Sequence, residues 1–151
     1  MPGYSQTPLV RKLGLKAGHR VALVGAPRGF ESTLGTLPDG LVLEATLGAG
    51  PFDMILLFVT SCAALADAFR PAAERLSPAG GLWVAWPKRA SRVPTDLTED
   101  VVREVGLTAG LVDNKVCAID ETWSGLRFVF RLIDRKKEQV RFGIDVCTDN
   151  G

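Results

Sequence analysis

The sequence predicts an α/β protein built on a shortened, doubly wound and mostly parallel sheet with an antiparallel hairpin near its carboxyl terminus. Up to Gly110, short apolar runs alternate with segments in which apolar residues recur at helical spacing. This order places parallel strands side by side through helical crossovers. After Gly110 two consecutive segments show a two-residue periodicity, which indicates an antiparallel pair. We therefore expect one domain at residues 1–133 and a tail at 134–151 that forms an edge strand or is disordered.

The stretch at residues 77–88 organises this prediction. Pro78 and the pair Gly80-Gly81 are expected to end a preceding helix, five apolar residues follow without a charge, and Pro87 stops the run. A short uncharged run entered from a helix is typical of a strand that is buried on both faces of a parallel sheet.

The elements before this stretch follow from turn residues and apolar spacing. We expect short helices near residues 9–13 and 30–37 and strands near 21–24, 41–44 and 53–59. Ser61 is predicted to cap a longer helix whose apolar residues recur up to Leu76. Pro71 lies inside that pattern and is expected to kink or divide the helix.

A further helix and a hairpin are predicted after the central stretch. Asp96 and Glu99 stand three residues apart in front of an apolar run, which is a capping-box spacing and predicts a helix start. The two segments of alternating periodicity, residues 112–119 and 126–133, are joined by a polar turn. They are expected to pair as antiparallel strands.

Composition excludes few classes of function. The chain has 151 residues, of which 46% are hydrophobic, so a single substantial core is expected. Lysine and arginine number 18 against 17 for aspartate and glutamate, and this balance gives no overall attraction to nucleic acid or membranes. The longest uncharged apolar run, residues 54–66, is shorter than the roughly 20 residues that span a bilayer. With no signal peptide at its start, the chain is expected to be a cytoplasmic protein without membrane contact.

No catalytic or metal-binding motif is visible. Cys62, Cys117 and Cys147 are widely spaced and contain no C-x-x-C pair, and His19 is the one histidine, so no zinc site of known spacing exists. A nucleophilic G-x-S-x-G motif is also missing. We therefore assign no catalytic residue and expect no metal.

The order of elements, with Leu76-Ser77-Pro78-Ala79-Gly80-Gly81-Leu82 before an inner strand, resembles the Rossmann-like methyltransferase fold of S-adenosylmethionine-dependent enzymes from about residue 16 to 133. The resemblance implies a cofactor loop after the first strand and a ribose-binding carboxylate at the end of the second strand. Glu44 matches that carboxylate by position.

The cofactor loop departs from the family pattern. Residues 25–29 hold two glycines four apart, a proline without an amide hydrogen and no acid, and the segment after Glu44 is too short for the helix and strand that usually follow. We therefore expect no cofactor, and S-adenosylmethionine in particular is disfavoured.

A second resemblance covers most of the chain up to about residue 132. The sequence is similar to a small bacterial family catalogued as domain of unknown function 3052, through the matching segments 3–9, 83–88, 95–103, 112–118 and 120–126. This resemblance implies no activity.

A candidate ligand site follows the inner strand. Trp86, Lys88, Arg89 and Arg92 lie just past its carboxyl end, where open α/β sheets usually bind ligands. Three cations beside an indole suit a phosphate or a nucleotide ring. The alternative is a solvated loop whose basic residues keep it soluble.

Three functions are left open by the sequence. The first is a non-catalytic binding or interaction module of methyltransferase-like fold, with an anionic small molecule or a protein as partner. The second is an S-adenosylmethionine-dependent small-molecule methyltransferase with a degenerate cofactor loop. The third is a nucleotide- or nucleic-acid-binding protein that uses Lys88, Arg89 and Arg92, although nucleic acid is not favoured.

Overall fold

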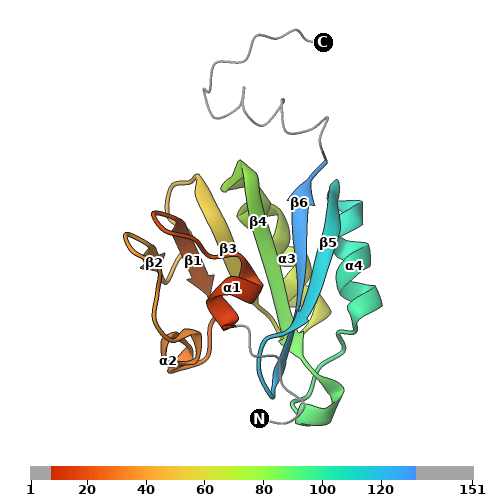
Figure 1. The fold of residues 1–151 in the computed structure, drawn as a ribbon. Coiled ribbons are helices and arrows are strands. Elements are labelled where there is room, and N and C mark those ends of the chain that lie inside the picture. The colour runs from red at the N-terminus through yellow and green to blue at the C-terminus, as the bar shows by residue number, and fades with distance from the viewer. Residues whose placement is uncertain (1–7, 132–151) are drawn as a thin grey trace, which may run out of the picture.

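A computed structural model describes residues 8–131, which form one six-stranded sheet with helices on both faces (Figure 1). The strand order is β2-β1-β3-β4-β6-β5, in which β2, β1, β3 and β4 run parallel and β6 and β5 add an antiparallel hairpin. The strands are β1 (Arg20–Val24), β2 (Val42–Glu44), β3 (Phe52–Phe58), β4 (Leu76–Pro87), β5 (Leu111–Ala118) and β6 (Trp123–Phe130). The predicted fold class is confirmed. The predicted tail at 134–151 and the last two residues of the second predicted hairpin strand lie outside the described residues.

The helices form a layer on each side of the sheet. Buried residues of α1 (Leu9–Leu13) and α2 (Phe30–Leu34) join one apolar cluster, and those of α3 (Cys62–Glu74) and α4 (Glu99–Thr108) join the cluster on the other face. The crossover after β1 thus uses one face and the crossover after β3 uses the other. The winding direction changes between these adjacent strands, and the crevice beyond their carboxyl ends is the usual ligand position in such sheets. Between residues 8 and 131, no helix has the length and apolar character needed to cross a membrane.

Strand β4 begins earlier than the sequence predicts. It spans 12 residues from Leu76, so the segment expected to be a turn before Leu82 is part of the strand. The ladder pairs Phe52 with Leu76 and then Met54 with Gly81, so the residues between Leu76 and Gly81 form a large bulge. A Cβ at Gly80 would lie 2.7 Å from the Asp53 carbonyl oxygen. The glycine pair therefore permits a close strand contact and does not end a helix.

Helix α3 starts as predicted and continues through its proline. The Ser61 hydroxyl accepts a hydrogen bond from the Ala64 amide at 3.1 Å, which confirms Ser61 as the N-cap. Pro71 lies inside the helix, which is one continuous element and is not divided. Because Pro71 is in the last turn, only one late backbone hydrogen bond is lost, and the guanidinium of Arg75 donates to the Pro71 carbonyl at 2.8 Å.

Helix α4 starts later than the predicted capping box. Thr98 is its N-cap, and the Thr98 hydroxyl accepts from the Val101 amide at 3.2 Å. Asp96 instead accepts from the Cys62 amide at 2.8 Å and so ties the segment before α4 to the start of α3. The spacing of Asp96 and Glu99 predicted the right region for the start of α4 but the wrong N-cap residue. The Asp96 carboxylate accepts from the Cys62 amide at the start of α3 instead.

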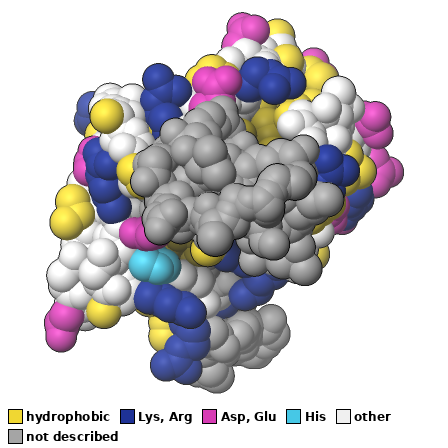
Figure 2. All heavy atoms as spheres, turned by 90° about the horizontal axis from the view of Figure 1, so that it is seen from above, with side chains coloured by type: hydrophobic (Ala, Val, Ile, Leu, Met, Phe, Trp, Pro, Cys, Tyr) yellow, Lys and Arg dark blue, Asp and Glu magenta, His cyan; other side chains and the backbone are white. Residues whose placement is uncertain are grey.

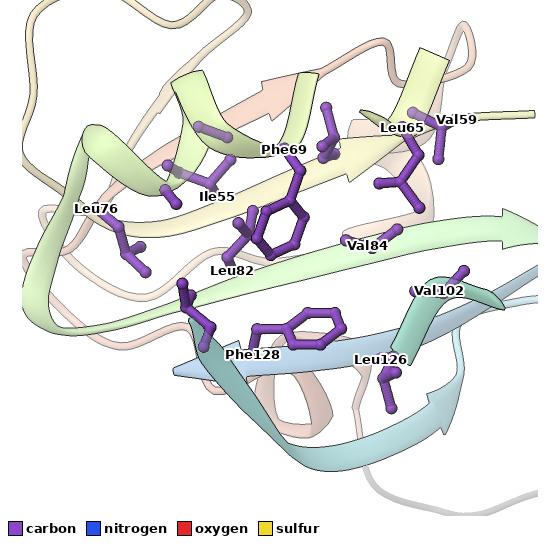
Figure 3. Packing of buried hydrophobic residues seen from close by; sticks show 14 of the residues in the cluster. Ile55, Val59, Leu65, Phe69, Leu76, Leu82, Val84, Val102, Leu126 and Phe128 are labelled. Carbon is purple, nitrogen blue, oxygen red and sulfur yellow. The ribbon is translucent and has the colours of Figure 1, made fainter. Parts of the chain in front are cut away.

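The larger core packs between the sheet and the helices α3 and α4. Figure 3 shows Phe69 reaching from α3 toward Leu82 of β4 and Phe128 of β6. The rings of Phe69 and Phe128 meet edge to face with centroids 5.3 Å apart, a preferred aromatic geometry. Gly106 of α4 lies against the same ring, since a Cβ at this position would come within 2.0 Å of Phe128. The glycine allows α4 to approach β6.

On the opposite face, the fully buried Trp83 of β4 organises the smaller core. Its indole nitrogen donates to the Leu13 carbonyl at 2.9 Å, which fixes the end of α1 over the sheet. Gly125 of β6 makes room for the indole, because a Cβ there would lie 3.0 Å from the ring.

We predict that Gly106→Ala destabilises the protein although alanine favours helices. The gain in helix propensity is about 1 kcal/mol, whereas overpacking a core costs about 1–3 kcal/mol. The expected net loss of unfolding free energy is therefore up to about 2 kcal/mol, measured by chemical denaturation. Thr108→Ala on the exposed side of the same helix is the control and should be neutral or slightly stabilising. A Gly106→Ala variant more stable than the wild type, as helix propensity alone would give, would contradict the close packing.

Candidate functional site

Two cavities open at the edge of the sheet where the parallel strands end. In Figure 1 this edge is at the bottom, where β1 leads toward α2 and β4 leads into the short helix η1 (Arg89–Ser91). Figure 2 looks onto the opposite end, where basic and acidic side chains are interspersed. Both cavities therefore occupy the position at which open α/β sheets bind ligands.

The first cavity, here called the β1–β2 cavity, has a volume of about 270 Å³. It lies beyond the carboxyl ends of these two strands and combines an apolar floor with two carboxylates. Its lining residues are Leu23, Gly25, Ala26, Pro27, Gly29, Phe30, Glu31, Leu43, Glu44 and Ala45.

The loop after β1 is shaped by its two glycines. Gly25 and Gly29 have φ angles of 72° and 82°, which is the left-handed region that favours glycine. A Cβ at Gly25 would also lie 2.9 Å from the Phe58 carbonyl oxygen of β3. Pro27 accepts a hydrogen bond from the Phe30 amide at 3.1 Å, which closes the turn. Within residues 8–131 the amides of Ala26 and Gly29 have no acceptor, and both residues line the cavity.

Glu44 is held by an ion pair that the sequence analysis missed. Arg20 of β1 donates from Nε and Nη2 to the two carboxylate oxygens of Glu44, at 2.7 and 3.1 Å. This hydrogen-bonded guanidinium lowers the pKa of Glu44 below its ordinary value of 4.5, despite partial desolvation. Glu44 is therefore ionised at neutral pH and fixed in orientation. A carboxylate has about four acceptor positions, so the pair leaves capacity for a ligand hydroxyl.

The second cavity, here called the β4 cavity, has a volume of about 580 Å³ and lies between the end of β4 and the start of α4. Four of the five predicted ligand residues line it together, namely Trp86, Lys88, Arg89 and Arg92, whereas Glu44 belongs to the β1–β2 cavity. The other lining residues are Pro87, Val93, Pro94, Thr95, Asp96, Leu97, Thr98, Glu99 and Ser124.

The four predicted residues contribute differently to the β4 cavity. Trp86 is 5% exposed and belongs to the larger core, so only its margin reaches the cavity. Lys88 is half-buried, and Arg89 and Arg92 are exposed. Ser124 of β6 was missed by the sequence analysis, because its position depends on the register that places it opposite Trp86.

Other reactive groups in the described part of the chain offer no alternative site. Burial raises the pKa of the half-buried Cys117 thiol, which keeps it protonated and a weak nucleophile at neutral pH. No three metal-ligating side chains come together between residues 8 and 131.

Comparison with solved structures identifies the fold. An S-adenosylmethionine-dependent methyltransferase from Aquifex aeolicus is 16% identical, with a TM-score of 0.53 over 80% of this chain and 86% of the other. A ribosomal protein L11 methylase from Lactobacillus delbrueckii subsp. bulgaricus is 13% identical, with a TM-score of 0.55 over 82% and 75% of the two chains. At such identities the likeness establishes the fold: the chain has a methyltransferase-like Rossmann architecture.

Two comparisons at the level of sequence gave no match. No protein-family model and no curated protein sequence matches this chain. Membership of the small bacterial family of unknown function therefore stays a prediction.

The comparisons correct the prediction that the chain has no cofactor. An O-methyltransferase of neocarzinostatin biosynthesis shares the fold and was solved with S-adenosylmethionine, at 12% identity and a TM-score of 0.51 over 76% of this chain and 49% of the other. A second structure of that enzyme holds S-adenosyl-L-homocysteine, with a TM-score of 0.54. The expectation drawn from the loop after β1, that S-adenosylmethionine is disfavoured, is contradicted by these neighbours of the same fold.

We predict that the Arg20–Glu44 pair makes stability depend on pH in the acid range. Because the pKa of Glu44 is lower in the folded protein than its ordinary 4.5, its contribution is complete above that pH and is lost as the pH falls through the lowered value. The wild type should thus unfold at a higher temperature than Glu44→Gln at pH 7, with the difference shrinking in acid. Glu74→Gln, at an exposed position on α3, should show no such trend. A difference that is equal at pH 7 and pH 3 would contradict the assignment.

Proposed function

We propose that this chain binds S-adenosylmethionine in the β1–β2 cavity and acts as a cofactor-binding module of methyltransferase-like fold. The observation that carries the proposal is the convergence of an ionised carboxylate, Glu44, and two available backbone amides, those of Ala26 and Gly29, on one cavity beyond the strand ends.

The donors and acceptors of this cavity match the parts of the cofactor. Glu44 would accept hydrogen bonds from the ribose hydroxyls, since a carboxylate can accept several at once. The Ala26 and Gly29 amides would donate to acceptor atoms, and the apolar side chains of Leu23 and Leu43 would line a flat ring. The volume of about 270 Å³ lies near the lower end for small-molecule sites. It is suited to the nucleoside part of the cofactor.

Methyl transfer is a second candidate function, and the β4 cavity is the observation that favours it. When bound, the cofactor supplies an electrophilic methyl group. A single strand, β3, separates β1 from β4, and neighbouring strands lie about 4.8 Å apart. The ends of β1 and β4 thus lie roughly 10 Å apart along the same edge of the sheet, and the methyl-transfer candidate places the acceptor molecule in the cavity beyond β4. Label from methyl-tritiated cofactor would move into a bacterial metabolite extract if transfer occurs, and would stay on the cofactor in a binding module.

Calorimetric titration of the full chain with S-adenosylmethionine tests the proposal. We expect saturable binding that Glu44→Gln weakens about tenfold to a hundredfold, because a hydrogen bond to a charged group contributes about 1.5–3 kcal/mol. Arg20→Gln is the matched control: it breaks the same ion pair but keeps the carboxylate, so its effect should be smaller. No detectable binding to the wild type would overturn the proposal. Equal losses in the two variants would show that Glu44 does not contact the ligand.

A further inference from the structure

We infer that the β4 cavity is a second ligand site, specific for a small anion that carries phosphate or carboxylate groups. The inference goes beyond cofactor binding, because it concerns different residues and a different ligand. It rests on the charge, the shape and the fixed backbone of the cavity.

The positively charged side chains of the β4 cavity are not neutralised by ion pairs. Among the described residues no acidic side chain forms an ion pair with Lys88, Arg89 or Arg92. The two acidic lining residues already have partners: Asp96 accepts from the Cys62 amide at 2.8 Å, and Glu99 accepts from Arg103 at 2.6 Å. The three cations are therefore free to form charge-assisted hydrogen bonds to an anion.

The loop that carries the cations is held in one conformation. The Lys88 amide donates to the Thr122 carbonyl at 2.7 Å, and the Ser91 hydroxyl donates to the Lys88 carbonyl at 2.7 Å. Arg92 has a φ of 64°, the one left-handed non-glycine residue between residues 8 and 131. Such a conformation persists only where the surrounding structure fixes it, and it is frequent at ligand clamps. Arg89 and Arg92 therefore lie at the start and at the end of one turn of fixed conformation.

The walls of the cavity select a small molecule over a nucleic acid. Its volume of about 580 Å³ is typical of sites for small organic ligands, and Trp86, Pro87 and Leu97 provide an apolar wall. The Glu99 side chain is 47% exposed, and that of the adjacent Asp100 is 96% exposed. Both carboxylates share the single cation Arg103 with Asp113, so this surface keeps a net negative charge that would repel an extended phosphate backbone, whereas a single anionic group can lie against the three cations of the cavity.

The test uses the isotope-labelled full chain, without cofactor, and follows backbone amide resonances during titration at constant ionic strength. The probes are inorganic pyrophosphate, citrate and a single-stranded oligonucleotide. We expect saturable shifts centred on residues 88–99 with pyrophosphate or citrate, and the stronger probe tells whether the site prefers phosphate or carboxylate. The triple variant Lys88→Gln, Arg89→Gln, Arg92→Gln should bind about tenfold more weakly or worse. Arg70→Gln, at an exposed position on α3, should stay within about twofold of the wild type.

Arg92→Gly separates binding from folding. Glycine adopts the left-handed conformation without strain, so this variant should unfold at the same or a higher temperature while binding the anion more weakly. Three outcomes would overturn the inference: no saturable shift at residues 88–99 with either small anion, wild-type affinity in the triple variant, or saturable binding of the oligonucleotide alone. None of them bears on cofactor binding, which concerns another cavity and is measured separately.

Discussion

The burial of both faces of β4 is the constraint on which the rest of the structure depends. Every residue from Gly80 to Pro87 is buried, so helices must cover the strand on both sides and neighbouring strands must occupy both edges. Trp83 fills one face and hydrogen-bonds to the end of α1, while Leu82 and Val84 face α3 and α4 on the other. A strand in this position cannot shift its register by one residue without exchanging these two sets of side chains. The positions of β3 and β6, and with them the cavities at the strand ends, follow from it.

The sequence analysis was most accurate for elements that depend on their own residues and on near neighbours in the chain. The uncharged run of β3 and the alternating residues of β6 have buried apolar side chains as expected. Ser61 caps α3 because its partner, the Ala64 amide, is three residues away. The errors arose where a residue contacts a distant part of the chain. Gly80 meets Asp53 across a bulge, and Asp96 binds the Cys62 amide instead of its own helix.

The candidate site was likewise predicted only in part from the sequence. The strand ends could be located from sequence, so Glu44 and the cations after β4 were identified as candidates. Their partners could not be located, because Arg20 meets Glu44 only through the register of two parallel strands. The prediction about the cofactor failed for a related reason. It counted glycines and noted the missing amide of Pro27, whereas the conformation of the loop leaves the amides of Ala26 and Gly29 available.

The two outer strands of the described sheet have a consequence for how copies of this chain behave at high concentration. An exposed strand edge offers unpaired backbone groups to a second molecule, and such pairing leads to aggregation. Here one edge, β2, is only three residues long. The other, β5, changes register between Asp113 and Lys115, and the Lys115 ammonium donates to the Lys12 carbonyl of α1 at 2.7 Å. A bulge with a lysine beside it is an unfavourable template for a further strand. The edge at β2 is therefore too short to recruit a neighbouring strand, and intermolecular β-pairing is discouraged at both edges of the sheet that residues 8–131 form.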